Sequence, residues 1–386
     1  MFHRISPPPA SSLHFTKGLR TPASEIRGTI SINIRQAVST HVHQVKIEYY
    51  VSFKTLVSFK RGDPNMTGRS REVIYNEVKT VWESPNPTSS SSSSSGGTLV
   101  PFVFYFPDNQ DLPPSFNHQT TRITARVCHG IRLYECRRDH PWSTVADCSF
   151  PFLPLDINPP VFHVEQIPQR SVTEGKDLRH GLNWHDGRVD VKLTMPDLDT
   201  IPLFQSVPVS LHVRSFSSGL AGPSRDVSTF TFPRLPSSPE QIQLKIKCTG
   251  NVRAGSHETE FEIDRRSVSG FGDAHSRSNA TVTQPRWIPH SDGIGGRWSQ
   301  EAIYTTNLFL SARVPPAFRI SYQSGYLSIT HQLKLRIPFS GLGNDLKMAI
   351  PLRVSSGIFE GIPLPDEYLY DIPPAYNEDE DGGSSE

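Results

Sequence analysis

Four residues near the C-terminal end of the chain have the spacing of a docking peptide. Pro373, Pro374, Ala375 and Tyr376 form a PPxY sequence. Two adjacent prolines preset a polyproline II conformation, so little conformational entropy is lost when the aromatic-lined groove of a WW domain binds them. Tyr376 can then fill the neighbouring pocket. The spacing predicts WW-domain binding at Pro373, Pro374 and Tyr376, with a chance match among the 34 prolines of the chain as the alternative.

The composition around this motif favours docking over chance. Residues 361–386 are Pro-rich at first and then acidic, with the run Glu378 to Asp381 after the tyrosine. This composition is typical of a disordered tail, in which a peptide reaches a partner without unfolding a domain. The other proline pair of this kind, in the segment Pro113 to Phe116, precedes a phenylalanine and lies among predicted strands. We expect a structural turn there.

Histidines at two places have spacings that a metal ion could use. His41 and His43 alternate on one predicted strand, and His180, His185 and Asp186 lie close together in the sequence. Neither set includes a further ligand at a recognised spacing. Residues 293–296 are glycine-rich but lack the Lys-Ser/Thr ending of a phosphate-binding loop, and the chain has no G-x-S-x-G motif. We therefore expect no metal site, no cofactor and no enzymatic activity.

The charge balance indicates protein partners. The chain has 39 basic and 38 acidic residues and a formal net charge of +1, so it has no overall field that would attract nucleic acid or an anionic membrane. Arg132, Arg137, Arg138 and His140 lie close together in the sequence. They are a candidate basic surface for anionic lipid or acidic peptides, with ordinary solvated residues as the simpler alternative.

Cysteine usage and hydropathy favour a cytoplasmic location. The 4 cysteines form no CxxC pair and no disulfide-dense pattern, as is typical of a reducing compartment. The N-terminal residues lack the apolar core of a signal peptide. No stretch approaches the roughly twenty apolar residues that cross a bilayer. We expect membrane contact to be peripheral or through a partner.

Strict alternation of apolar and polar residues recurs along the chain. It is clearest from Val45 to Phe53, from Val189 to Met195, from Val207 to Val213 and from Leu346 to Val354. A period of two places one apolar face on each strand. Such closely spaced strands must bury these faces against a second sheet, because one sheet alone leaves them in water. The sequence predicts an all-β fold of antiparallel β-sandwiches.

The length of 386 residues suits two such domains in tandem. We place the boundary in the Pro-punctuated segment Phe150 to Pro160. The predicted organisation is a disordered N-terminus (1–12), an N-terminal sandwich (13–150) with a flexible Ser-rich loop (86–97), a C-terminal sandwich (151–360) with a long loop (265–296), and a disordered acidic tail (361–386) with the PPxY motif.

Several segments resemble arrestin sequence blocks. Phe102 to Phe116, followed by the strand Thr121 to Val127, is similar to the aromatic strand, "lPpSf" turn and next strand of the arrestin N-terminal domain. Ser328 to Ile337 resembles the "i.H.Lkv.i" strand of fungal α-arrestins, and Met348 to Val354 resembles their closing strand. Thr124 stands where many relatives carry tyrosine. The likeness spans about residues 13 to 356.

This resemblance implies two arrestin-like, immunoglobulin-like sandwiches and an adaptor function. α-Arrestins use PPxY peptides to recruit HECT-type ubiquitin ligases to membrane cargo, which is then ubiquitinated and internalised. We therefore expect a WW-domain ligase and the cytosolic parts of membrane transporters or receptors as partners, and recruitment to the plasma membrane and endosomes. Adaptors of this family are often ubiquitinated themselves, which makes Lys334 and Lys347 candidate acceptors.

Two other functions fit the same strand pattern. One is an arrestin-like scaffold in endosomal, retromer-type sorting, in which the PPxY sequence has no role. The other is a secreted adhesion sandwich, and glycosylation at the sequons of Asn65 or Asn279 would support it.

Overall fold

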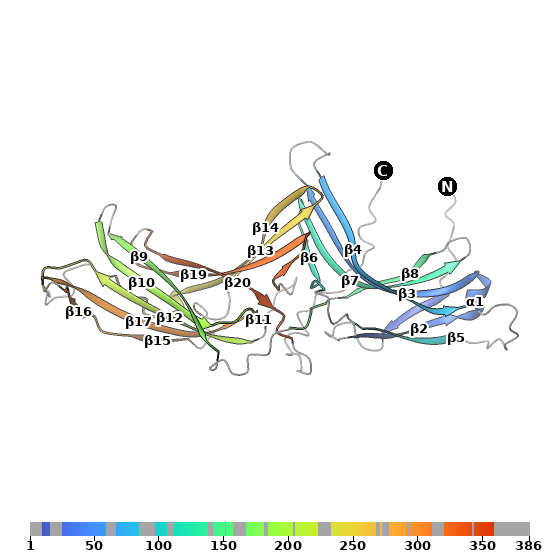
Figure 1. Cartoon of the computed structure of the whole chain (residues 1–386), viewed down its shortest axis with the longest axis horizontal. Coiled ribbons are helices and arrows are strands. Elements are labelled where there is room, and N and C mark those ends of the chain that lie inside the picture. Colours follow the sequence, from blue (N-terminus) through green and yellow to red (C-terminus); the bar gives the residue numbers. More distant parts are fainter. Residues whose placement is uncertain are drawn as a thin grey trace.

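The computed structural model of the chain is built almost entirely of β-strands (Figure 1). It describes residues 10–15, 25–58, 67–84, 97–105, 112–137, 142–150, 152–156, 167–180, 184–203, 205–222, 233–267, 271, 278–291, 294–310, 320–341 and 343–358. The predicted all-β class is confirmed, and the sheets are mainly antiparallel.

Two sheets come from the first part of the chain. A three-stranded sheet has the order β1-β2-β5, made of β1 (Ser11–Phe15), β2 (Glu25–Asn33) and β5 (Gly97–Tyr105). A five-stranded sheet has the order β4-β3-β7-β6, with β8 also paired to β7; its strands are β3 (Val42–Ser58), β4 (Thr67–Glu83), β6 (Phe116–Gln119), β7 (Ile123–Arg137) and β8 (Ser143–Phe150). The short helix α1 (Ile34–Ser39) links β2 to β3, and the Asn33 side chain caps its first turn.

The second part of the chain forms another pair of large sheets. The first has the order β15-β17-β12-β10-β9 with β16 also on β17, from β9 (Gln169–His180), β10 (Trp184–Pro196), β12 (Ser206–Ser217), β15 (Asn279–Val282), β16 (Arg286–Pro289) and β17 (Gly296–Phe309). The second has the order β14-β13-β19-β18 with β20 also on β19, from β13 (Gln243–Ala254), β14 (His257–Ser267), β18 (Tyr322–Gln323), β19 (Leu327–Ile337) and β20 (Leu346–Leu352). Two short strands, β11 (Ile201–Pro202) and β21 (Val354–Ser355), pair in parallel.

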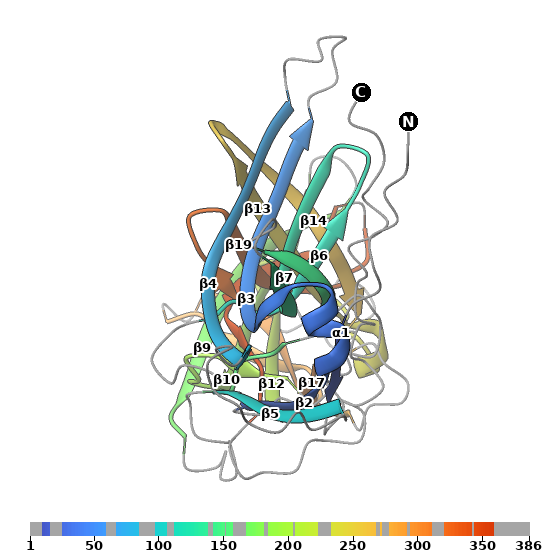
Figure 2. The same cartoon turned by 90° about the vertical axis from the view of Figure 1, so that its right-hand side faces the viewer.

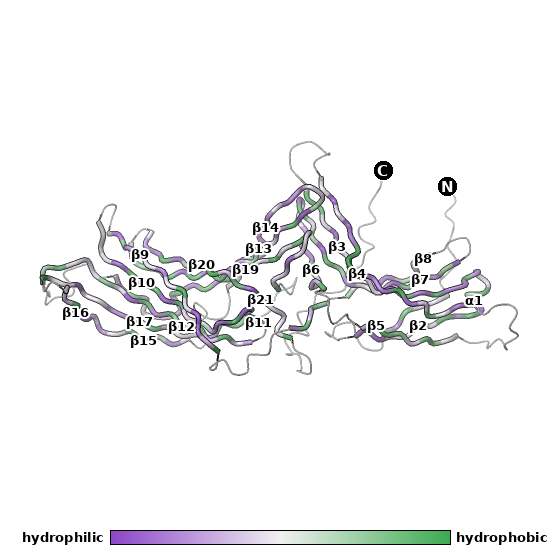
Figure 3. The backbone as a smooth tube through the Cα atoms, viewed as in Figure 1, coloured by the Kyte–Doolittle hydropathy of each residue, from purple (hydrophilic) through white to green (hydrophobic). Residues whose placement is uncertain are grey.

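The alternation read from the sequence gives the inward faces of these strands. The residues at 45, 47, 49, 51 and 53 of β3 are all buried, as are those at 207, 209, 211 and 213 of β12. Figure 3 shows the apolar and polar positions alternating along the strands. Because side chains at a period of two share one face, each large sheet contributes an apolar layer to a core.

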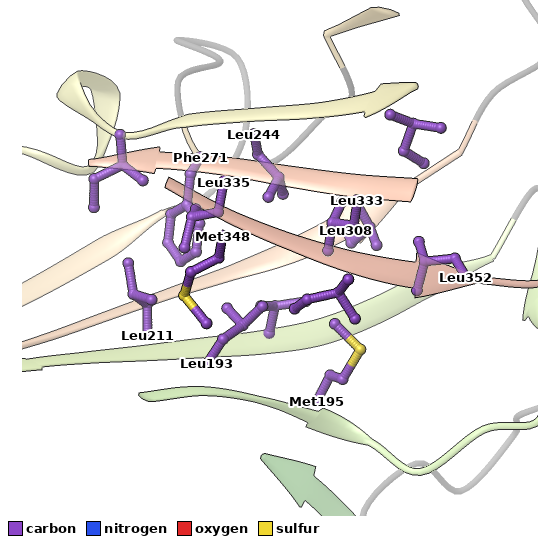
Figure 4. Close-up of a cluster of buried hydrophobic side chains, with 14 of the residues drawn as sticks. Leu193, Met195, Leu211, Leu244, Phe271, Leu308, Leu333, Leu335, Met348 and Leu352 are labelled. Atoms are coloured by element: carbon purple, nitrogen blue, oxygen red, sulfur yellow. The ribbon is translucent and has the colours of Figure 1, made fainter. Parts of the chain in front are cut away.

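Two hydrophobic clusters follow from this pairing. The described residues of the first cluster lie between Leu153 and Ile358. In Figure 4, Leu193 and Leu211 of one sheet point toward Leu335 and Met348 of the other. The second cluster is made mainly of residues from the first part of the chain. Among the described residues, every strand ladder joins partners within 11–150 or within 169–355.

Strands from the two parts of the chain also meet in an aromatic seam. In Figures 1 and 2, β13 and β14 rise beside the ends of β3 and β4. The Phe53 ring lies 6.0 Å from that of Tyr326, and the His118 ring stacks on Phe261 at 4.4 Å. The Thr55 hydroxyl donates to the carbonyl of Arg253 at 3.1 Å. The hydrophobic cluster of the first part of the chain thus includes residues from the second part, among them Cys248 and Val252 of β13.

The structure corrects two predicted segments. The N-terminus was expected to be disordered over 1–12, but Ala10 is buried and β1 begins at Ser11. The loop expected over 265–296 contains the short strands β15 and β16, whose exposed polar residues hide the alternation. Trp287 of β16 pairs with Trp298 of β17, with ring centroids 5.8 Å apart. Residues 86–96 of the predicted Ser-rich loop lie outside the described residues. Gly97, the last residue of that predicted loop, begins β5.

Candidate functional site

The predicted WW-binding residues Pro373, Pro374 and Tyr376 lie outside the described residues, so their role stays a prediction. The two candidate ubiquitin acceptors are both described. Lys334 is half-buried on β19, and Lys347 is exposed on β20. They lie on neighbouring strands and on the same outward face, because each alternates with buried leucine, isoleucine or methionine.

Strand register places these lysines in a larger basic surface, here called the basic face. Its members are the outward cations of three consecutive cross-strand rows: Lys245, Lys247, Lys334, Arg336 and Lys347. Lys245 is directly opposite Lys334, and Arg336 lies between Gln243 and Lys347. Leu244, Ile246 and Leu335 alternate with them and point into the core. Burial of the apolar set therefore fixes the direction in which the cations point.

The cations of the basic face repel one another, which disfavours a purely structural role for this surface. Like charges directly opposite on antiparallel strands are destabilising by several tenths of a kcal/mol, on the order of 0.5. Arg336 is paired with Asp345, with Nε 2.6 Å from the carboxylate. The four lysines have no hydrogen bond or ion pair in the part of the chain that the structure describes. An anionic ligand would remove this repulsion.

The outer face of the neighbouring large sheet provides a contrast, because its charges are largely paired. The Glu301 carboxylate accepts from Arg214 at 2.7 Å and from Arg286 at 3.0 Å, and lies 3.2 Å from His212 Nε2. The hydrogen bond from Arg214 is the main cause that holds the pKa of Glu301 below its usual range. Arg188 pairs with Asp190 at 2.8 Å. This face resembles an ordinary solvated lattice of ion pairs.

A polar hollow of about 410 Å³ adjoins the basic face on the same sheet. Its lining consists of Lys247, Thr249, Gly250, Asn251, Glu260, Ser328, Thr330, His331, Gln332 and Pro351. Hydroxyl and amide groups can donate to or accept from a peptide backbone, so the lining suits an extended polar chain. At this end of the sheet β14 presents Glu258, Glu260 and Glu262, of which Glu260 lines the hollow, and the Asn251 amide donates to Glu258 at 2.6 Å. The sheet is therefore basic at one end and acidic at the other.

Comparison with known proteins leaves the chain unassigned. No protein-family model and no curated protein matches it. The resemblance to arrestins stays a prediction, and the chemistry of the basic face rests on its own geometry. In the described residues, no helix has the length and apolar content of a membrane span.

The other sequence candidates have local partners or lie outside the described residues. Arg132 is 2.6 Å from Asp147, and Arg137 donates to Glu135 at 2.9 Å. Arg138 and His140 are not among the described residues. The two described arginines of this predicted basic surface are thus neutralised by carboxylates.

The histidine candidates do not form a described cluster. His41 has a positive φ of 57° in the turn after α1, and His43 lies at a register shift of β3, so the two do not share a regular strand face. His180 lies on β9 and His185 on β10, but their side chains are not among those that the structure describes. Among the described residues, no group of three or more potential ligands could hold a metal ion.

The "lPpSf" segment, expected to be a structural turn, is a buried irregular stretch that leads into β6. Pro113, Pro114, Ser115 and Phe116 are buried. The carbonyl of Pro113 accepts from His129 Nε2 at 2.7 Å, and the backbone N–H of Phe152 donates to the Ser115 hydroxyl at 2.9 Å. The segment is thereby held between β7 and the residues after β8. This proline pair is accordingly part of the fold and not a docking peptide.

Proposed function

We propose that this chain is a non-enzymatic adaptor that joins a membrane protein to a WW-domain ubiquitin ligase of the HECT type. Its folded part binds a cytosolic segment of the cargo, and the PPxY sequence binds the ligase. One chain with both sites raises the effective concentration of the ligase at the cargo without any chemistry of its own. The adaptor works in the cytoplasm and is recruited to the plasma membrane and endosomes.

The observation that carries the cargo-binding half is the basic face. Four lysines without described partners are held on a formed sheet, and two of them oppose each other across β13 and β19. The ligase-binding half is supported by Pro373, Pro374 and Tyr376 in the sequence. The arrestin-like segments and the confinement of strand ladders to 11–150 and 169–355 support two sandwiches in tandem. Lys347, exposed on β20, is the more accessible candidate for ubiquitination.

The docking peptide can be tested by a double substitution. Pro373→Ala with Tyr376→Ala removes the preset backbone conformation and the aromatic anchor, so we expect affinity for a WW-domain HECT ligase to fall at least about tenfold. The measurement is capture of the full chain by the immobilised WW domains of such a ligase. The far-ultraviolet circular dichroism spectrum should be unchanged, since these residues follow the last described strand.

A matched control uses the other proline-rich segment of the tail. Pro363→Ala with Tyr368→Ala removes a proline and a tyrosine outside the PPxY sequence and should leave WW capture intact. Unchanged capture by the Pro373→Ala, Tyr376→Ala variant would rule out docking at this motif. An unbiased interaction screen that returned coat proteins and no ligase would instead support the sorting scaffold.

A further inference from the structure

We infer that the outer face of the β13, β14, β19 and β20 sheet binds an extended peptide of mixed charge, acidic where it crosses the basic face and basic where it reaches β14. This inference names the class of ligand for the folded part of the proposed adaptor and rests on that function. The ligand is a linear segment of a protein, with its two charge blocks separated by a polar stretch.

The basic end of the ligand site is defined by strand register. Three successive rows are Gln243–Arg336–Lys347, Lys245–Lys334–Ala349 and Lys247–Gln332–Pro351. Successive outward rows of a strand are about 7 Å apart, so these rows cover about 14 Å. Acidic side chains at alternate positions of an extended peptide have the same spacing. Two or three carboxylates can thus lie over the three rows at once.

The acidic end lies on the same face at the other end of β13. Asn251 is opposite Glu260, and Arg253 is opposite Glu258. The row of Asn251 is three rows from that of Lys245, a separation of about 20 Å. An extended chain of about six residues spans this distance. The centres of the acidic and basic blocks of the ligand are therefore about six residues apart.

The hollow between these ends suits the intervening stretch. Thr249, Thr330 and Gln332 contribute hydroxyl and amide groups to its lining, and Pro351 bounds it on β20. Such groups pair with the backbone of a peptide whatever its side chains. Small polar residues between the charge blocks would allow that backbone to approach the sheet.

The shape and the two signs of charge select among ligands. In Figure 1 this sheet curves along its length, and the ends of β13 and β14 rise above the level of β20, so that the outer face is concave. Two concave faces cannot pack flat against each other, which disfavours a second copy of the chain as the ligand. A nucleic acid or an anionic membrane presents a single sign of charge, and Glu258, Glu260 and Glu262 would repel it.

The test compares synthetic peptides of one composition. The block peptide carries about four glutamates, a Ser/Gly spacer of about two residues and about four lysines, so that its block centres are about six residues apart, and the interleaved peptide has the same residues with the charges alternating. Fluorescence anisotropy with the full chain should show that the block peptide binds at least about tenfold more tightly than the interleaved one. Higher salt should weaken this binding, because the contacts are exposed ion pairs.

Charge reversal locates the site. Lys245→Glu with Lys334→Glu should lower affinity for the block peptide at least about tenfold, because both carboxylates then repel its acidic block. The matched control is Lys192→Glu with Arg234→Glu, which reverses two exposed charges away from this sheet face and should leave the affinity unchanged. Circular dichroism and thermal unfolding verify that both variants are folded.

Three outcomes would overturn the inference: equal affinity for block and interleaved peptides, unchanged binding by the Lys245→Glu, Lys334→Glu variant, or preference for phosphatidylserine vesicles over the block peptide. The proposed adaptor function is tested separately, because WW-domain capture depends on Tyr376 and not on Lys245 or Lys334. A chain that captures WW domains but does not discriminate between the peptides contradicts this inference alone.

Discussion

Replacing Glu135 with leucine is expected to lower the free energy of unfolding by about 3 to 5 kcal/mol. Glu135 lies on β7 with its side chain fully buried. Its Oε1 accepts from the backbone N–H of Ala10 at 2.7 Å and of Ser11 at 2.9 Å, and from the Ser11 hydroxyl at 2.9 Å. Arg137 donates to Oε2 at 2.9 Å. One carboxylate thus holds the start of β1 against the opposite sheet.

Leucine has nearly the shape of glutamate but accepts no hydrogen bond. The substitution leaves two backbone N–H groups, a hydroxyl and part of a guanidinium without their acceptor inside the protein, and unpaired buried donors cost about 1 to 3 kcal/mol each. Glu135→Gln is the matched control, because its amide oxygen can still accept from Ala10 and Ser11, whereas the charge and the acceptor for Arg137 are lost. We expect it to cost about 1 to 2 kcal/mol.

Urea unfolding gives the stability of both variants, and hydrogen exchange of residues 10–15 reports on β1 itself. In the leucine variant the amides of Ala10 and Ser11 should exchange much faster than in the glutamine variant. If leucine and glutamine had equal effects below about 1 kcal/mol, the carboxylate would not be the anchor of β1.

Acid is expected to destabilise the fold through His129, by about 2 kcal/mol at pH 5 relative to neutral pH. His129 is fully buried on β7, and its ring stacks on Phe152 at 4.3 Å. The Pro113 carbonyl can only accept, so Nε2 carries the proton of the neutral ring. Nδ1 then accepts from the Tyr49 hydroxyl at 2.9 Å. Protonation of Nδ1 would remove the acceptor of the Tyr49 hydroxyl.

Burial lowers the pKa of His129 to about 3, although the hydrogen bond to Pro113 opposes this shift. In the unfolded chain the histidine titrates near its ordinary pKa of about 6.5. Between these values the unfolded state binds a proton that the folded state does not. The contribution of His129 to stability is therefore complete above about pH 6.5 and is lost as the pH falls toward 3.

NMR of the His129 ring distinguishes this group from the other titrating residues. Its carbon and proton shifts should remain those of a neutral Nε2–H ring at pH 5. Tyr49→Phe, which removes the donor to Nδ1, should lower stability at neutral pH by about 1 to 3 kcal/mol. A His129 ring that titrates near pH 6.5 would contradict the buried neutral form.

The strand faces were predictable because burial acts at a period of two. From Val45 to Phe53 and from Val207 to Val213 the apolar positions in the sequence are the buried positions in the structure. Strands β15 and β16 were missed because they are short and largely exposed, so burial imposes no alternation on them. Glu135 could have been noticed in the sequence, because it is a charged residue that follows Ile131 and Leu133 at the period of two of the buried face.

The basic face could be predicted only in part. Lys245 and Lys247 alternate with Leu244 and Ile246, so the sequence indicates that they point outward. That Lys245 meets Lys334 depends on the pairing of β13 with β19, about ninety residues later in the chain. The register of such distant strands is set by packing of the whole sheet. Lys334 and Lys347 were singled out for ubiquitination, and their place in a ligand-binding surface was not foreseen.

A bridging experiment tests the adaptor account most directly. Beads that carry WW domains of a HECT-type ligase are incubated with the full chain and the fluorescent block peptide, and the retained fluorescence is measured. We predict retention by the unaltered chain, and at least about tenfold less with either Tyr376→Ala or Lys245→Glu plus Lys334→Glu. Equal retention by all three proteins, or none by the unaltered chain, would contradict the account.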